Sequence, residues 1–174
     1  MNARVRGVFI AGTDTGVGKT RVTVALLHAL AARGVRAAGM KPVAAGTEAA
    51  GPGAGVDAEA AAPVNEDVAL IRAAAAIDGP AADINPYCFE WPISPHLCAR
   101  RTGVQIEPAA IAAAYARLAA RCEAVVVEGA GGWLAPIGEQ RTMADVARTL
   151  ALPVLLVVGV RLGCLNHALL SARA

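Results

Sequence analysis

Aromatic residues, charged residues and long apolar runs are all scarce in this chain of 174 residues. Aromatic residues make up 3% of it and charged residues 17%, and the formal net charge is only +2. Nucleic-acid-binding proteins stack aromatic side chains on bases and place positive charge beside phosphates. Because this chain has few aromatic residues and little net positive charge, we expect no nucleic-acid partner. No stretch approaches the roughly 18–20 uninterrupted apolar residues of a membrane span, and the first apolar run is too short for a secretory signal peptide, so we expect no membrane partner.

Cysteine is scarce as well, and its spacing shows no pattern. The four cysteines stand at positions 88, 98, 122 and 164 and include no Cys-x-x-Cys pair. Neither a zinc site nor a disulfide framework is therefore predicted, and a reducing cytoplasm is the expected compartment.

Apolar residues are abundant instead, at 56% of the chain, and much of the excess is alanine. Short runs rich in valine or isoleucine, at 5–12, 35–41, 124–128 and 153–160, predict buried parallel strands. Helical patterns lie between and after them, at 19–33, 67–77, 108–121, 142–150 and 165–174, and the fourth has a capping-box-like start. This alternation predicts a three-layer α/β fold, with a mainly parallel central sheet flanked by helices.

The length fits a single domain over residues 1–174. Its last predicted helix is followed by no strand, although alternating sheets usually continue, so we expect the domain to lack its C-terminal part. Residues 47–63, rich in alanine, glycine and proline, predict a flexible surface loop. Residues 85–95 contain three prolines and three aromatic residues, which favours a fixed, non-repetitive segment that either lines a pocket or covers the core.

The strongest motif is GTDTGVGKT at 12–20, placed between a predicted strand and a predicted helix. Backbone N–H groups of such a glycine-rich turn can surround phosphate oxygens, while Lys19 reaches the β- and γ-phosphates and the Thr20 hydroxyl binds Mg²⁺. The standard pattern would put its first glycine where this chain has Thr13, so Gly12 makes a variant loop with one extra spacer. The motif and its position predict a P-loop NTPase fold that uses ATP and Mg²⁺.

Three further charged residues stand at predicted strand ends or at a helix start. Glu128 ends an apolar strand and leads into a glycine-rich loop, where P-loop proteins commonly hold Mg²⁺ with a carboxylate. Lys41, after the second strand, could neutralise a reacting anion or simply be solvated. Asp67 could be a second metal ligand or an N-terminal helix cap. The turn at 159–167 could be another anion site or a plain strand-helix turn.

Taken together, these segments resemble the dethiobiotin synthetase family. The matching segments, in the family's order, are GTDTGVGKT, GMKPVAAGTE, NEDVAL, NPYCFEWPISPH, VVVEGAGGWLAPI, TMADV and LPVLLVVGVRLGCLNHALL, and they cover most of the chain outside 47–63. The resemblance implies a homodimeric P-loop ligase of biotin synthesis. Such an enzyme uses ATP, Mg²⁺ and CO₂ or bicarbonate to close a ureido ring on diaminopelargonic acid through a carbamic-phosphoric anhydride, giving dethiobiotin, ADP and phosphate.

The resemblance also implies roles for individual residues by matching position. Lys41 and Lys19 match catalytic lysines, and Thr20, Asp67 and Glu128 match the Mg²⁺ ligands. Nucleotide contacts are implied for Thr15, Gly16, Val17, Gly18, Lys19, Thr20, Asp67, Glu128, Gly129, Ala130 and Gly131. Substrate contacts are implied for Lys41, Ala45, Gly163, Cys164, Leu165 and Asn166, the last four reaching a site in the neighbouring subunit.

Two departures from the family pattern affect these expectations. Family members often carry serine where this chain has Ala45, which removes a hydroxyl expected to contact the substrate. The family also continues past position 174 with a strand whose asparagine reads adenine.

Three other readings compete with the synthetase. ATPase switches of plasmid partition carry a signature lysine five residues before the P-loop lysine, where this chain has Asp14. Related ligases that act on cobyrinic acid-type substrates carry a glutamine-amidotransferase domain that is not seen in this sequence. The third reading is a truncated, inactive synthetase.

Overall fold

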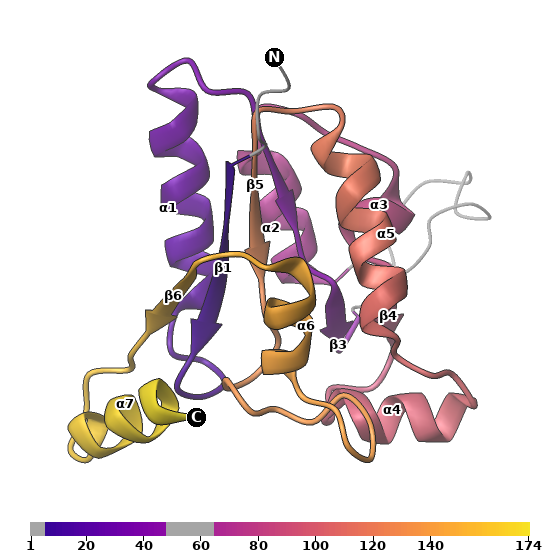
Figure 1. The fold of residues 1–174 in the computed structure, drawn as a ribbon, viewed down its shortest axis with the longest axis vertical. Coiled ribbons are helices and arrows are strands. Elements are labelled where there is room, and N and C mark those ends of the chain that lie inside the picture. Colours follow the sequence, from indigo (N-terminus) through magenta and orange to yellow (C-terminus); the bar gives the residue numbers. More distant parts are fainter. Residues whose placement is uncertain (1–5, 48–64) are drawn as a thin grey trace, which may run out of the picture.

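The structure of the chain is a computed structural model that describes residues 6–47 and 65–174 (Figure 1). The loop predicted at 47–63 lies, apart from its first residue, outside the described residues and stays a prediction. Within the described residues, the four predicted parallel strands form the central sheet, and their order in it is β2-β5-β1-β6. The strands are β1 (Arg6–Gly12), β2 (Ala37–Met40), β5 (Ala124–Glu128) and β6 (Val154–Val157).

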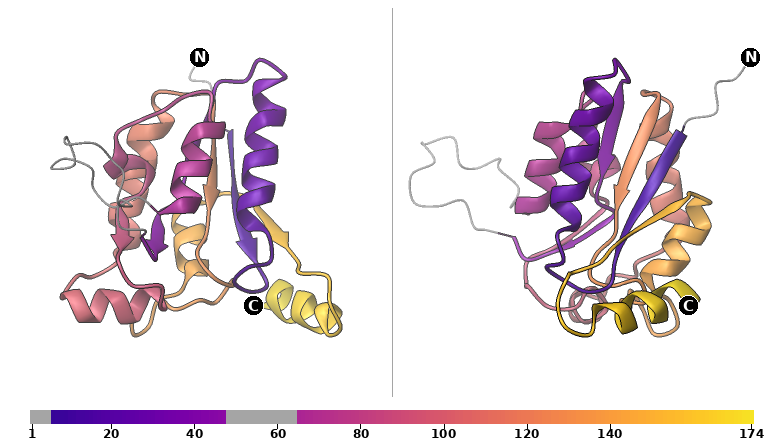
Figure 2. Two further views of the ribbon diagram at one scale, coloured as in Figure 1. Left: turned by 180° about the vertical axis from the view of Figure 1, so that it is seen from behind. Right: turned by 90° about the vertical axis from the view of Figure 1, so that its left-hand side faces the viewer.

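Helices cover both faces of this sheet and make the predicted three layers (Figure 2). One face carries α1 (Lys19–Ala31) and α2 (Glu66–Ala74), and the other carries α5 (Pro108–Ala119) and α6 (Met143–Leu150). Successive strand residues point to opposite faces. On β1, Phe9 therefore joins the core under α5 and α6, while Ile10 joins the core under α1 and α2. Both side chains are fully buried, which explains why the strands are apolar without alternation.

A glycine on β2 lets α2 pack close to the sheet. A Cβ added to Gly39 would lie 2.2 Å from Cγ2 of Ile71, a fully buried residue of α2. Any larger residue at position 39 would push the helix away. Because Asp67 lies in the first turn of α2, this close packing helps to set the position of its carboxylate.

The sequence did not predict the second, two-stranded sheet. In it β3 (Val43–Ala45) pairs in parallel with β4 (Tyr87–Phe89). The prediction of a wholly non-repetitive segment at 85–95 was therefore wrong over β4, because three residues are too few to show the strand period. Two helices were also missed, α3 (Ala81–Ile84) and α4 (Pro95–Thr102).

The other predicted elements occur with shifted boundaries. β5 matches its prediction, and α1, α5 and α6 begin at Lys19, Pro108 and Met143 as expected or one residue later. The predicted helix 67–77 runs instead from Glu66 to Ala74. The last helix, α7 (Cys164–Arg173), buries none of its residues in the described structure.

No helix in the described ranges has the length and apolar character needed to cross a membrane.

Candidate active site

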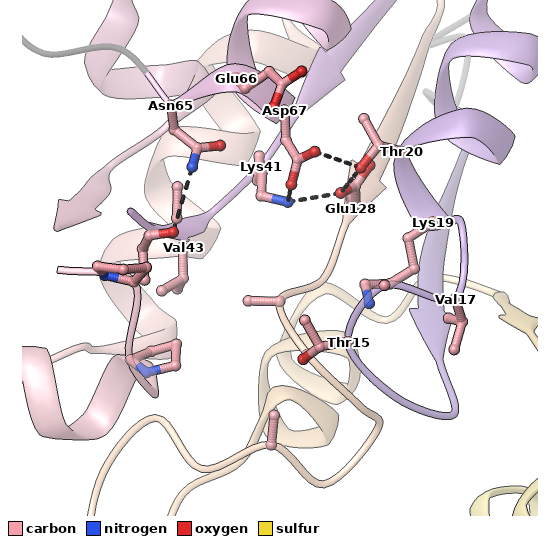
Figure 3. Close-up of a pocket in the computed structure, with 18 of the residues that line it drawn as sticks. Thr15, Val17, Lys19, Thr20, Lys41, Val43, Asn65, Glu66, Asp67 and Glu128 are labelled. Carbon is pink, nitrogen blue, oxygen red and sulfur yellow. Dashed lines mark hydrogen bonds and ion pairs between the residues drawn. The ribbon is translucent and has the colours of Figure 1, made fainter. Parts of the chain in front are cut away.

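A cavity of about 910 Å³ opens where β1, β2 and β5 end (Figure 3). The carboxyl edge of a parallel sheet is where α/β proteins bind their ligands. The cavity brings together most of the residues predicted from the sequence. Those that line it are Thr15, Gly16, Val17, Gly18, Lys19, Thr20, Lys41, Ala45, Asp67, Glu128, Ala130 and Gly131.

The loop between β1 and α1 requires glycine for two different reasons. Gly16 and Gly18 adopt φ angles of 73° and 97°, in the left-handed region that side chains disfavour. Gly12 is needed for space, because a Cβ there would lie 3.0 Å from Lys19 Cδ and from Val17 Cγ2. Although the motif has one extra spacer residue, its first glycine, Gly12, therefore still lies where the loop leaves no room for a side chain.

Lys19 is held inside this loop. Its side chain is largely buried, and its ammonium donates a 2.9 Å hydrogen bond to the carbonyl oxygen of Asp14. Burial lowers the pKa of Lys19, and repulsion from Lys41 lowers it further. Negative charge entering the loop would offset both effects, so the loop and its lysine suit a phosphate group.

Lys41 lies between two carboxylates that come from different parts of the chain. Its Nζ donates to Asp67 Oδ2 at 2.6 Å and to Glu128 Oε1 at 2.7 Å (Figure 3). Glu128 is fully buried and Lys41 is 5% exposed. The suggestion that Lys41 is merely solvated is therefore wrong, because its charge is paired in the wall of the cavity.

The same carboxylates have acceptor capacity that the hydrogen bonds of the neighbouring donors leave unfilled. The Thr20 hydroxyl lies 2.8 Å from Asp67 Oδ1 and 2.9 Å from Glu128 Oε1, but it has only one proton to donate. Glu128 Oε2 is buried and has no hydrogen-bond partner among the described residues. A buried acceptor without a partner is costly, and a cation beside it would remove that cost. The oxygens of Thr20, Asp67 and Glu128 therefore fit a bound Mg²⁺.

This oxygen set is incomplete as a metal shell. Among the described residues, no group of three or more His, Cys, Asp or Glu side chains could hold a metal by itself. Mg²⁺ typically binds one or two carboxylates and completes its shell with water and substrate phosphates. The two carboxylates and one hydroxyl beside the phosphate loop match that habit.

Asp67 does not cap α2, although the sequence left that possibility open. Asn65 is the N-terminal cap, and its Oδ1 accepts a 3.4 Å hydrogen bond from Val68 N. Burial acts to raise the pKa of Asp67, but the charge and hydrogen bond of Lys41, together with the Thr20 hydroxyl, lower it below its usual value. The Asp67 carboxylate is thus ionised and directed into the site.

Some predicted residues lie elsewhere. Gly129 does not line the cavity, and its N–H donates to the carbonyl of Ile10 at 2.9 Å. The turn at 163–166 also lies outside the cavity wall, and Leu165 in it is 79% exposed. The contact of that turn with the substrate, which the resemblance implies, is therefore not made at the cavity of one subunit.

The cavity wall also includes residues that the sequence did not single out as site residues. The cavity is lined by Pro92, Ile93, Ser94 and Pro95, while Phe89 is buried in the core. The segment 85–95 therefore both lines a pocket and covers the core, the two roles that its composition left open. Asn65 is buried, lines the cavity, and donates through its Nδ2 to Gly46 O at 2.6 Å. Its only signal in the sequence was its place just before Asp67.

Comparison with known proteins gives a consistent result. A family model described as an AAA domain matches residues 6–174. ATP-dependent dethiobiotin synthetase BioD of Aromatoleum aromaticum is 49% identical over 170 residues, which is 97% of this chain and 71% of the relative. The proteins of the same name from Nitrosospira multiformis and Xanthomonas euvesicatoria are 47% and 49% identical, over 97% and 95% of this chain and 69% and 70% of their own lengths. With identity this high over more than two thirds of each relative, the chain belongs to the dethiobiotin synthetase family.

Proposed function

We infer that this chain is an ATP-dependent dethiobiotin synthetase, a ligase that forms carbon-nitrogen bonds in biotin synthesis. It joins CO₂ to diaminopelargonic acid and closes the ureido ring, while ATP becomes ADP and phosphate. The observation that carries this function is the single cavity in which the phosphate loop, two lysines and two carboxylates meet.

The reaction creates negative charge at each stage, and the two lysines lie where they can offset it. One substrate amine adds to CO₂ and loses a proton, which gives a carbamate. A carbamate oxygen attacks the γ-phosphate of ATP and ADP leaves; the second amine then attacks the carbamate carbon, and phosphate leaves as the ring closes. We assign Lys19, inside the phosphate loop, to the phosphates of ATP, and Lys41 to the carbamate and its mixed anhydride with phosphate.

The chain's own oxygens would hold the metal. We assign Thr20, Asp67 and Glu128 as Mg²⁺ ligands, because the single Thr20 proton lies near an oxygen of each carboxylate and the buried Glu128 Oε2 has no partner among the described residues. When bound, Mg²⁺ supplies positive charge to the phosphate oxygens. Lys41 would then exchange its two carboxylate partners for the reacting anion, which enters from the cavity beside it.

We also propose that the active unit is a homodimer. The apolar side chains of Val160, Leu162 and Leu165, around the turn at 163–166, are 94%, 104% and 79% exposed. Exposed large apolar side chains that stand close together in the chain favour an interface. In the dimer, the turn at 163–166 of one subunit would bind the carboxylate of a substrate that lies mainly in the site of the other subunit.

We place the enzyme in the cytoplasm, where ATP is available and where its four free cysteines stay reduced.

The test is a phosphate-release assay with ATP, Mg²⁺ and bicarbonate, run with and without diaminopelargonic acid. We expect release that depends on the diamine, with dethiobiotin identified by mass. Release of phosphate that does not respond to the diamine would contradict the assignment and would favour an ATPase switch.

A further inference from the structure

The backbone at Lys41 belongs to neither sheet. β2 ends at Met40, which pairs with Val127, and β3 begins only at Val43. Lys41 and Pro42 therefore cross from the central sheet to the second sheet. The side chain that must reach two carboxylates thus starts from a stretch that no ladder of strand hydrogen bonds fixes.

The neighbouring ladder ends on this crossing, where its outermost bond runs from the N–H of Tyr87 to the carbonyl of Pro42 at 3.1 Å. Its first pair is Val43 with Tyr87, and the residues before them include Pro42 and Pro86. Proline has no N–H to donate, so Pro42 cannot continue the ladder with a bond of its own.

The side chain of Asn85 supplies a donor instead. Its Nδ2 donates to the carbonyl oxygen of Lys41 at 2.6 Å and to that of Tyr87 at 3.1 Å. The N–H of Lys41 in turn donates to the carbonyl of Ile84 at 2.9 Å. Both backbone groups of Lys41 are therefore bonded to two consecutive residues at the end of α3.

Capping of α3 does not explain these contacts. The backbone N–H of Asn85 closes that helix through a 2.8 Å bond to Ala81 O, whereas its side chain makes no hydrogen bond to the helix. Any residue but proline could provide the backbone bond. Only a side chain with two N–H donors on one short, rigid group can bond both carbonyls at once.

We propose that Asn85 is a positioning residue that fixes the Lys41 backbone, so that its ammonium lies within reach of the reacting anion. This inference rests on the proposed function, which gives Lys41 its role. Asn85 acts from outside the site, because it does not line the cavity. Misplacement of a reacting group by about 1 Å can lower a rate by about 100-fold, so a backbone anchor matters to the chemistry.

The first test is the Asn85→Ala variant. We expect kcat to fall by about 10- to 100-fold, because Lys41 samples positions away from the anion. The KM for ATP and the affinity for a non-hydrolysable ATP analogue should stay within about threefold, because the phosphate loop is not touched. Asn65→Ala is the matched control, because it also removes an amide that is bonded to two carbonyls, those of Ala45 and Gly46. Asn65 lies next to Asp67 rather than Lys41, so in this variant we expect a rise in the Mg²⁺ concentration needed for half-maximal activity.

A double-mutant cycle separates positioning from a general structural effect. If Asn85 acts through Lys41, adding Asn85→Ala to Lys41→Gln should change the residual kcat by less than about twofold. Losses that multiply in the double variant, or an equal rise of every KM in Asn85→Ala, would overturn the proposal.

A second readout does not depend on turnover. Acylation of Lys41 by an amine reagent, followed by mass spectrometry with Lys19 as the internal reference, should be faster in Asn85→Ala than in the unmodified chain. Unchanged acylation would contradict the inference even if the chain were inactive. If the chain makes dethiobiotin and Lys41→Gln lowers kcat to a small residual value while Asn85→Ala is fully active, the inference fails and the proposed function stands.

Discussion

Lys41 has two roles at the scale of single residues. In the structure its ammonium neutralises Asp67 and the fully buried Glu128, and in the proposed reaction it faces the anion. Removing one member of a buried ion pair leaves the other uncompensated, which typically costs about 3–5 kcal/mol. The half-exposed Asp67 adds little to this, so the cost arises mainly from Glu128.

We therefore expect Lys41→Met to be less stable than the unmodified chain when no metal is present, and to gain more stability on addition of Mg²⁺. The reason is that a cation can replace the ammonium between the carboxylates. Thermal unfolding with and without Mg²⁺ measures both effects. Lys19→Met is the control, since Lys19 pairs with a carbonyl and not with these carboxylates. An equal response to Mg²⁺ in both variants would argue against Lys41 and the metal sharing one site.

Turnover should be lost in Lys41→Met, while binding of ATP stays largely intact.

At the scale of elements, α6 depends on a carboxylate at its start. Asp145 Oδ2 accepts from the backbone N–H of Thr142 at 2.7 Å and from its hydroxyl at 3.0 Å. The backbone hydrogen bond from Thr142 lowers the pKa of Asp145, and the Thr142 hydroxyl and Arg148 lower it further. The capping start predicted at 142 is confirmed, with aspartate in the place of the usual glutamate.

The lowered pKa has a defined effect on stability. A carboxyl with a depressed pKa contributes its full stability above its unfolded pKa of about 3.9 and loses it as the pH falls through the folded value. We expect Asp145→Asn to cost about 1 kcal/mol at pH 7 and to cost progressively less below about pH 4. Urea unfolding at a series of pH values measures this difference. A difference that does not change with pH would mean that the charge of Asp145 is not involved.

The packing of α2 on β2 is a second element-scale feature that affects the site. We expect Gly39→Ala to destabilise the chain by about 1–3 kcal/mol, because its new Cβ would meet Ile71. Because α2 carries Asp67, the KM for Mg²⁺ should rise as well. Adding Ile71→Ala makes room for the methyl group, so the double variant should lose less than the sum of the single variants. Strictly additive losses would show that the contact between these two positions is not the cause.

At the scale of the whole molecule, the site and the turn at 163–166 are separate in one subunit. If the site takes that turn from a neighbour, two different inactive variants should restore each other. Mixing Lys41→Gln with Asn166→Ala, after dissociation and reassociation, makes half of the dimers mixed. Each mixed dimer has one intact site, so we expect about a quarter of the unmodified activity. No recovery, in a mixture shown to contain mixed dimers, would place the turn outside the site.

Local patterns in the sequence were enough for most of the fold. Continuous apolar runs predicted the buried parallel strands, since a strand covered by helices on both faces must be apolar throughout. The phosphate loop was also predicted, because its chemistry depends on adjacent residues between Gly12 and Thr20. The short strands β3 and β4 and the helix α4 were not, because pieces this small or this irregular are stabilised by their neighbours rather than by their own periodicity.

The sequence by itself determined which groups the site contains: a phosphate loop, two lysines and two carboxylates, each at the end of a strand or the start of a helix. Only the tertiary structure decided how they are used. It gave the cap of α2 to Asn65 rather than to Asp67, paired Lys41 with both carboxylates, and brought Asn85 to the Lys41 backbone. These contacts join residues 26, 87 and 44 positions apart in the chain. Hydrogen bonds and ion pairs act over a few ångströms, so partners that distant in sequence meet only after the sheet has assembled.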